Sequence, residues 1–297
     1  MEQAITRRSF SLMLGSVAAG TAIIHPGRSA AAADPLTSKI TEIETRLKAR
    51  VGVAVFDDET GRSWQHNADA RFPLNSTFKA LAVAALLARV DAGAVDLSRS
   101  IRFQASDILT YSPITEKRVG GDGMTLTELC AATLAVSDNT AANLVLDSIG
   151  GPQGFTAFMR SIGDSVTRLD RWETDLNEAK PGDPRDTTTP NAIAASLRKV
   201  VLGDVLSPAA RQQLTDWMMA NRVSDAMLRA GLPKSWRIAD RSGAGGHGAR
   251  SIIAVMWPPS RKPIIAAVYL TETTASFNAR NAAIAEIGKV IRTVMEG

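Results

Sequence analysis

The chain has 297 residues, 45% of them hydrophobic, and a formal net charge of +4 at pH 7. This nearly even balance of positive and negative charges does not indicate a nucleic-acid partner. The length provides an ample core for one domain of two lobes or for two small domains. After residue 33 only His66, His247 and Cys130 could supply nitrogen or sulfur ligands, and they lie far apart in the sequence, which disfavours metal-dependent hydrolysis.

Residues 1–33 predict an export signal and not a part of the fold. A twin-arginine motif at 6–10 precedes an apolar stretch, 11–24, that is too short to span a bilayer. An ordinary secretory signal is the alternative, because paired arginines also fit the positively charged N-terminal region of such signals. Cleavage after Ala33 would leave a mature protein of net charge +2. We expect that protein to be periplasmic or secreted, without a membrane anchor, and monomeric.

The two ends of the mature chain predict an α/β sheet layer. Helices at its start and end carry apolar faces, the first through Ile40, Ile43 and Leu47. Strand-like runs lie between those helices, at 51–56, 62–66, 236–242, 251–257 and 263–270. Residues 34–66 and 218–297 therefore predict one sheet lobe, and 67–217, which reads mainly helical, predicts an inserted helical lobe.

Ser76 and Lys79 form the first chemical motif. A helix is predicted from Thr77 to Ala92, apolar on most sides, with Gly93 ending it. Residues three apart share a helix face, so the Lys79 amine should lie beside the Ser76 hydroxyl, which needs a base to become a nucleophile. Taken alone, the motif more often means a capping serine and a solvated lysine.

Ser137-Asp138-Asn139 is the second motif. The pattern Thr125-Leu126-Thr127-Glu128 is a capping box and predicts a helix to about Ala135, which delivers the motif from a loop beyond its end. Cys130 lies on an apolar face of that helix, where a buried structural thiol is expected.

Glu173 and Asn177 stand in a loop, 171–186, that is rich in Pro and Gly and suits a compact Ω-loop. Glu173 and Asn177 are four residues apart. On one helical turn, the carboxylate of the first and the carboxamide of the second could hold one water molecule between them.

Arg241-Ser242-Gly243 completes the set, which in this order resembles that of the class A serine β-lactamases. The resemblance covers nearly everything after residue 36. It implies an α/β (α+β) fold shared with penicillin-binding proteins, in which a five-stranded antiparallel sheet with flanking helices joins an inserted all-helical lobe. It also implies hydrolysis of the β-lactam amide of penicillin-type antibiotics, antibiotic resistance, and no cofactor. Arg241-Ser242-Gly243 and the residues through Ser251 resemble the carbenicillin-hydrolysing subgroup.

The resemblance also implies a role for each motif residue. Ser76 is the nucleophile, Ser137 passes a proton to the leaving nitrogen, and Glu173 with Asn177 drives deacylation. The acylation base stays open between Lys79 and Glu173. The backbone N–H groups of Ser76 and Ala244 would form the oxyanion hole. The residues implied to bind substrate are Tyr111, Asn139, Arg241, Ser242, Gly243 and Arg250.

Some assignments have a plain alternative. The ion pair Arg171–Asp186, implied to close the loop, could be two exposed charges. Tyr111 could be an ordinary surface tyrosine, and His247 is better explained as an exposed turn residue than as a substrate contact.

Two departures from the family pattern bear on the site. Thr174 stands where many members have proline, so either the loop carries a strained cis bond or its path differs. Arg241 stands where lysine is usual, and its planar fork could shift substrate preference.

Two other functions remain open. A D,D-peptidase would share the serine and lysine, but Glu173 and Asn177 argue against it. A penicillin-sensing domain would stay acylated and be joined to a membrane segment, which the sequence lacks.

Overall fold

The computed structural model describes residues 34–296, so the predicted export signal lies outside the described residues. Helix α1 (Pro35–Leu47) begins after Asp34, whose side chain accepts a hydrogen bond from the Leu36 amide at 2.8 Å. Such a cap satisfies one of the free amides at the helix start. In the described part of the chain, every helix is too short or too polar to cross a membrane.

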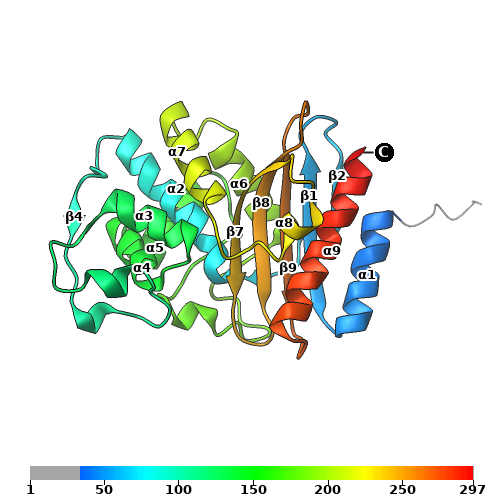
Figure 1. The fold of residues 1–297 in the computed structure, drawn as a ribbon, viewed down its shortest axis with the longest axis horizontal. Coiled ribbons are helices and arrows are strands. Elements are labelled where there is room, and N and C mark those ends of the chain that lie inside the picture. Colours follow the sequence, from blue (N-terminus) through cyan, green and yellow to red (C-terminus); the bar gives the residue numbers. More distant parts are fainter. Residues whose placement is uncertain (1–33, 297) are drawn as a thin grey trace, which may run out of the picture. The chain divides into compact units, whose positions relative to one another are not determined.

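Five strands form one antiparallel sheet (Figure 1). They are β1 (Arg50–Asp57), β2 (Ser63–His66), β7 (Arg237–Ala244), β8 (Arg250–Trp257) and β9 (Ile264–Thr271). Their order is β2-β1-β9-β8-β7, with Arg50 opposite Thr271 and Ala244 opposite Arg250. The predicted five-stranded antiparallel sheet is confirmed, and each predicted strand is within two residues of its observed bounds at either end.

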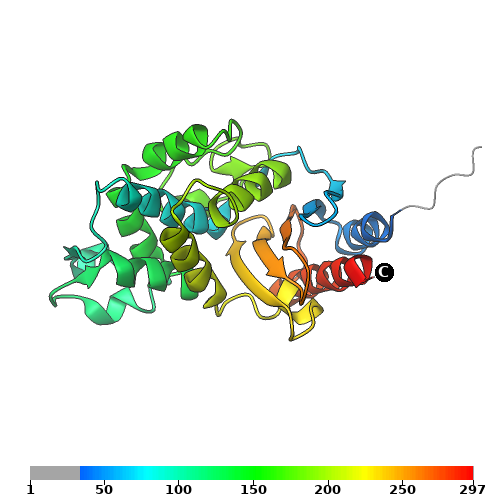
Figure 2. The ribbon, with the colours of Figure 1, turned by 90° about the horizontal axis from the view of Figure 1, so that it is seen from above.

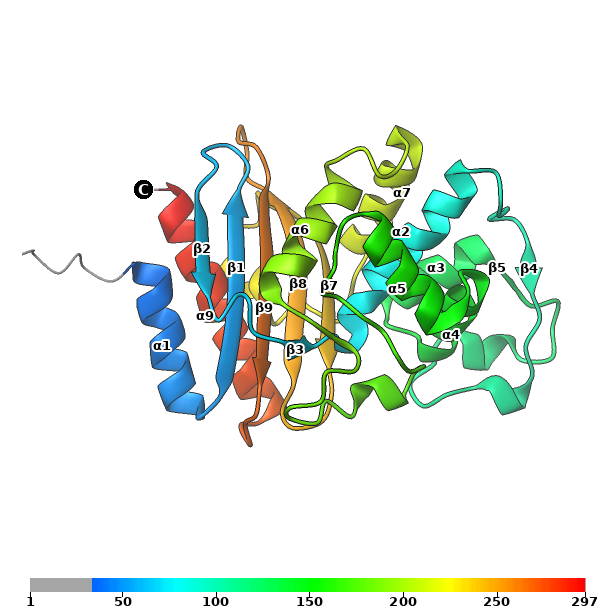
Figure 3. The same cartoon turned by 180° about the vertical axis from the view of Figure 1, so that it is seen from behind.

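Helices cover both faces of this sheet. On one face lie α1, the short helix α8 (Leu228–Gly231) and the last helix α9 (Phe277–Glu296) (Figures 1 and 2). Ile40, Ile43, Ile284 and Ile287 fill the core beneath them, as the amphipathic patterns predict. On the other face α6 (Pro190–Val201) packs against β1, β8 and β9 (Figure 3).

The inserted region is mainly helical. Its other helices are α2 (Phe78–Asp91), α3 (Leu126–Ala135), α4 (Asn139–Ser148), α5 (Gly151–Ser161) and α7 (Pro208–Met219). Helix α2 is buried from Phe78 to Leu87, as its apolar sequence predicts. The capping box is present, since Glu128 accepts from the Thr125 amide at 2.7 Å and donates its own amide to the Thr125 hydroxyl.

The expectation of an all-helical lobe needs one correction. Two short antiparallel pairs lie within the same span, β3 (Phe72–Pro73) with β6 (Thr187–Thr188), and β4 (Ser100–Ile101) with β5 (Met124–Thr125). Each strand has only two residues, too few to show a period-2 pattern in the sequence. Residues 34–296 form one compact unit, so the lobe boundaries at 67 and 217 stay a prediction.

Candidate active site

Ser76 lies at the point where the chain enters the buried helix α2. It is the middle residue of a 3-10 turn, Asn75–Thr77, that leads directly into the helix. The Thr77 hydroxyl lies 2.9 Å from the hydroxyl of Tyr269 on β9 and donates to Leu74 O at 2.6 Å. The turn is therefore tied to the sheet, and its serine is held at the end of a fixed helix.

Lys79, one turn further on, is fully buried and donates to three residues. Its Nζ lies 2.7 Å from Asn139 Oδ1, 3.0 Å from Ser137 O and 3.0 Å from Glu173 Oε1. Within residues 34–296 its hydrogen bonds do not include the Ser76 hydroxyl, the predicted neighbour. Burial lowers the pKa of Lys79 to about 8, and the charge of Glu173 opposes that shift.

The second motif straddles a loop and the start of a helix. Ser137 has a positive φ of 65°, and Asp138 is the N-cap of α4, accepting from the Ala141 amide at 2.9 Å. The same buried carboxylate accepts from the Thr115 amide at 2.9 Å. Asp138 thereby fixes the loop so that the Ser137 hydroxyl lies 3.2 Å from the Ser76 hydroxyl.

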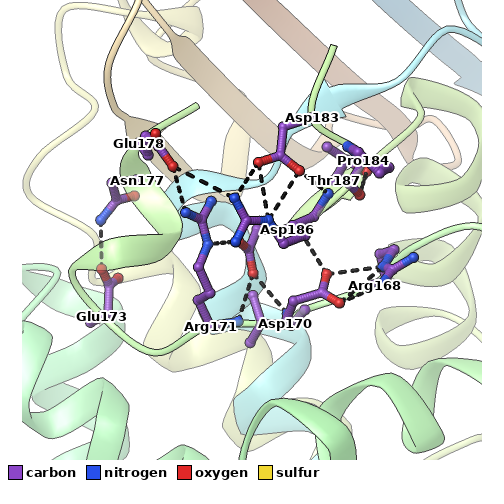
Figure 4. A network of polar contacts seen from close by, with 12 residues as sticks. Arg168, Asp170, Arg171, Glu173, Asn177, Glu178, Asp183, Pro184, Asp186 and Thr187 are labelled. Carbon is purple, nitrogen blue, oxygen red and sulfur yellow. Dashed lines mark hydrogen bonds and ion pairs between the residues drawn. The ribbon is translucent and has the colours of Figure 1, made fainter. Parts of the chain in front are cut away.

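Glu173 is buried and contacts the nucleophile Ser76. Its Oε1 lies 3.5 Å from the Ser76 hydroxyl, and its Oε2 accepts from Asn177 Nδ2 at 2.6 Å (Figure 4). A 3-10 turn, Asp175–Asn177, follows Glu173 and brings Asn177 back to its carboxylate, as the spacing of four residues predicts. The bond from Glu173 to Thr174 is cis.

Asn143 on α4 holds the backbone of Glu173 from both sides. Its Oδ1 accepts from the Glu173 amide at 3.0 Å, and its Nδ2 donates to Glu173 O at 3.1 Å. Sequence reasoning missed this residue. Its position four after Asn139, on the same helix face, is the signal that could have revealed it.

The Ω-loop, residues 171–186, is closed by buried charge (Figure 4). Arg171 Nε donates to Asp186 Oδ2 at 2.6 Å, and Arg171 Nη1 donates to Glu178 at 2.6 Å. Asp186 is only 1% exposed and also accepts from the amides of Asp170 and Arg171. The alternative of two exposed charges is therefore wrong.

Arg241 is buried on β7 behind the nucleophile. Its Nε donates to Ser76 O at 3.2 Å and its Nη1 to Leu134 O at 3.1 Å, while Nη2 has no hydrogen-bond partner among the described residues. Burial lowers its pKa to about 10. The backbone of β7 passes so close that a Cβ on Gly243 would stand 2.9 Å from the Ser76 amide nitrogen, which leaves room only for glycine there.

Arg250 on β8 is held by α9. Its Nε donates to Asn281 Oδ1 at 2.7 Å, and its Nη1 donates to Gly243 O at 3.0 Å. The face of Phe277 covers the guanidinium at 4.6 Å, and Arg280 approaches the same ring at 5.5 Å. Burial lowers the pKa of Arg250 to about 10.

These side chains meet at a cleft of about 320 Å³. The cleft is lined by Ser76, Tyr111, Ser137, Asn139, Asn177, Val223, Arg241, Ser242, Gly243, Ala244, Arg250 and Phe277. Lys79 and Glu173 are not part of this lining and lie buried behind it. Tyr111 is half exposed at the cleft, and His247 is an exposed turn residue, as expected.

Sequence reasoning did not single out Val223 or Phe277. Val223 accepts hydrogen bonds at 3.5 Å from both Ser242 and Arg250 through its backbone carbonyl, which any residue could supply. Phe277 begins α9, 27 residues after Arg250 in the sequence. No local pattern marks either contact, because both depend on the folded sheet.

The arrangement provides the parts for acyl transfer. A serine hydroxyl lies within reach of a carboxylate and a second hydroxyl, beside a buried amine. Two arginines and Ser242 provide donors suited to a substrate carboxylate. Nothing in this chemistry requires a cofactor.

Comparisons with known proteins agree with this chemistry. The model of the β-lactamase enzyme family matches residues 35–295. β-Lactamase AER-1 of Aeromonas hydrophila is 53% identical over 257 residues, which cover 86% of this chain and 84% of that protein. β-Lactamase PSE-4 of Pseudomonas aeruginosa is 50% identical over 252 residues, 85% of this chain and 87% of that protein.

Solved structures show the same likeness. An ancestral class A β-lactamase superposes with a TM-score of 0.86 at 57% identity, covering 87% of this chain and 99% of the other. A putative class A β-lactamase, PenP from Rhodopseudomonas palustris, gives a TM-score of 0.86 at 50% identity, covering 88% of this chain and 100% of the other.

Proposed function

This chain belongs to the class A β-lactamase family and hydrolyses the β-lactam amide of penicillin-type antibiotics, which confers resistance, and we propose the following roles for its residues. The observation that carries the proposal is the position of Glu173, whose one carboxylate contacts Ser76, Lys79 and Asn177. The enzyme is a penicillinase of the carbenicillin-hydrolysing type.

Acylation begins with attack of Ser76 Oγ on the lactam carbonyl. In the resting site Lys79 donates hydrogen bonds to three residues, as a protonated amine does, and we therefore assign it the role of a cation and not of the base. Glu173 takes the serine proton, directly or through one water molecule. Lys79 stabilises the carboxylate and the loop of Ser137 as a cation.

The oxyanion that forms on the carbonyl is bound by backbone amides. Those of Ser76 and Ala244 stand at the cleft, one on the nucleophile turn and one at the end of β7. As the C–N bond breaks, Ser137 gives its hydroxyl proton to the leaving nitrogen. Lys79 Nζ lies 3.2 Å from the Ser137 hydroxyl and can replace that proton. Glu173, 3.0 Å from Lys79, then passes to the lysine the proton it took from Ser76, so that Glu173 is again a carboxylate and Lys79 again a cation before deacylation.

Substrate binding uses the sheet edge and the rim. The hydroxyl of Ser242 and the Arg250 guanidinium bind the substrate carboxylate, and the buried positive charge of Arg241 beside them attracts it. Asn139 binds the amide of the substrate side chain while its Oδ1 holds Lys79. Gly243 allows close approach, and Tyr111 borders the entrance.

Deacylation completes the cycle. Glu173 and Asn177 hold a water molecule, which gives a proton to Glu173 as its oxygen attacks the ester carbonyl. The ester C–O bond breaks, Ser76 regains its proton, and the ring-opened acid leaves. The pair Arg171–Asp186 keeps the loop that carries Glu173 in place.

The proposed location follows from the sequence. We propose that residues 1–33 direct export by the twin-arginine route and that the mature enzyme is periplasmic or secreted, without a membrane anchor.

Mass spectrometry of the mature protein mixed with carbenicillin tests this function. Catalytic loss of the drug with only a transient protein adduct is expected, and Ser76→Ala should abolish both. A stable adduct with stoichiometric drug loss would instead identify a penicillin-binding protein or sensor. Labelling of Ser76→Ala at another residue would contradict the assigned nucleophile.

A further inference from the structure

A second pocket, of about 410 Å³, lies beside the Ω-loop and shares no lining residue with the active-site cleft. One wall is the loop from Leu176 to Thr187. The other is the body of the protein, namely the start of β1, the segment before β3 and the end of β9. Any molecule in this pocket therefore touches both the loop that carries Glu173 and the sheet lobe.

The pocket carries excess positive charge. Five cationic residues line it against two carboxylates. Two of the cations are neutralised within the pocket, since Arg50 pairs with Glu272 at 2.6 Å and Arg185 with Asp183 at 2.7 Å. A third, Arg171, is neutralised from outside the pocket by Asp186 and Glu178.

Arg71 and Lys180 form no ion pair within the described residues. Among residues 34–296 neither has a carboxylate oxygen within 4.0 Å. Arg71 belongs to the body, where its Nη1 donates to Val166 O at 3.1 Å and to Thr187 Oγ1 at 2.9 Å. Lys180 is exposed on the Ω-loop. Each wall of the pocket thus carries one cation that forms no ion pair.

The rest of the lining is largely apolar. Pro73 on the body and Leu176, Ala179 and Pro184 on the loop contribute carbon surface. A volume of this size accommodates a small organic molecule. The walls therefore suit a compact apolar body that carries two negative groups, one for each free cation.

We propose that this pocket is a binding site for a small organic dicarboxylate, which bridges Arg71 on the body and Lys180 on the Ω-loop. Bound ligand ties the loop to the sheet lobe and slows its local opening. Binding does not depend on turnover, so the site can be tested apart from the catalytic roles above.

Isophthalate titrated into the mature protein, followed by ¹⁵N amide NMR, tests the proposal. Phenylboronic acid at saturating concentration keeps the cleft at Ser76 occupied, so binding at Arg241 and Arg250 is blocked. Saturable shifts confined to the pocket are expected, together with slower hydrogen exchange of amides in 178–187. Benzoate, with the same ring and one carboxylate, should bind about tenfold more weakly.

Variants locate the ligand. Lys180→Gln and Arg71→Gln should each weaken isophthalate binding about tenfold, because each removes one charge-assisted contact. The Lys180 side chain makes no hydrogen bond within the described chain, and the backbone bond from the Asp183 amide to Lys180 O does not depend on the side chain, so the variant should fold normally. Lys234→Gln removes an exposed cation outside the pocket lining and should leave binding unchanged.

Any one of the following results would overturn the proposal. They are no saturable binding below about 10 mM, equal binding of benzoate, loss of binding when the boronic acid is present, and equal affinity in Lys180→Gln and the parent protein. Pyrophosphate serves as an inorganic polyanion, and binding as tight as that of isophthalate would contradict the assigned organic class.

Discussion

Glu173 Oε1 lies 3.0 Å from Lys79 Nζ, and both side chains are fully buried. This contact joins the buried helix α2 to the Ω-loop across the nucleophile. It keeps the lysine cationic in a place where burial alone would favour the neutral amine. The same carboxylate oxygen accepts from the Ser76 hydroxyl at 3.5 Å, so one oxygen contacts both the amine and the nucleophile.

The first prediction concerns pH. Lys79 has a pKa of about 8, lowered mainly by burial, so it loses its proton as the pH rises through 8. If Lys79 acts as a cation and Glu173 as the base, kcat/KM for a penicillin should fall above pH 8. Arg241 and Arg250 have pKa values of about 10, so the substrate-binding charges persist through that window. A profile that rises to a plateau above pH 8 would identify neutral Lys79 as the base.

Asn143→Ala should impair deacylation. The variant removes both hydrogen bonds that hold the Glu173 backbone, and it leaves the Ser76, Ser137 and Lys79 side chains unchanged. We expect the deacylation rate to fall about 10- to 100-fold, as small misplacements of a catalytic group do. Pre-steady-state kinetics should show acyl-enzyme accumulating. Loss confined to acylation would assign Asn143 another role.

Arg171→Ala should destabilise the protein. It leaves Asp186 buried without its cation, at a cost of about 3 kcal/mol. The melting temperature should fall by about 5–10 °C for a chain of this size. Arg185→Ala, the matched control, breaks an exposed pair with Asp183 and should change the melting temperature little. An equal fall in melting temperature for the two variants would show that burial of Asp186 does not make its ion pair more important for stability.

Phe277→Ala should raise KM for penicillins about threefold to fivefold and leave kcat nearly unchanged. The ring covers the Arg250 guanidinium at 4.6 Å, and an exposed contact of this kind contributes about 0.5–1 kcal/mol. Phe277→Trp retains an aromatic face and should restore the parent KM. Failure of tryptophan to rescue, or a loss confined to kcat, would argue against a positioning role for the ring.

The sequence predicts the parts of this protein that local patterns encode. The apolar run after Thr77, the capping box at Thr125 and the alternating strands each correspond to an observed element. The motif order also places Ser76, Ser137 and Arg241 at one cleft. These features depend on neighbours in the chain, which is why they can be read from it.

Contacts between distant segments could not be predicted in the same way. Lys79 was expected beside Ser76, because the two share a helix face. The amine and the Ser76 hydroxyl share two partners, Glu173 Oε1 and the Ser137 hydroxyl. The contact with Glu173, 94 positions later, is the part that only the folded loop provides. The ring of Phe277 over Arg250 likewise depends on how α9 packs on the sheet.

The most direct test of the account is intact-mass and peptide mass spectrometry of Glu173→Gln mixed with benzylpenicillin. Glutamine keeps the size of the side chain but cannot accept the proton of the attacking water. The account predicts an adduct of the whole penicillin on Ser76 that forms slowly and persists for far longer than in the parent enzyme. Drug turnover at the parent rate, or an adduct on any other residue, would contradict it.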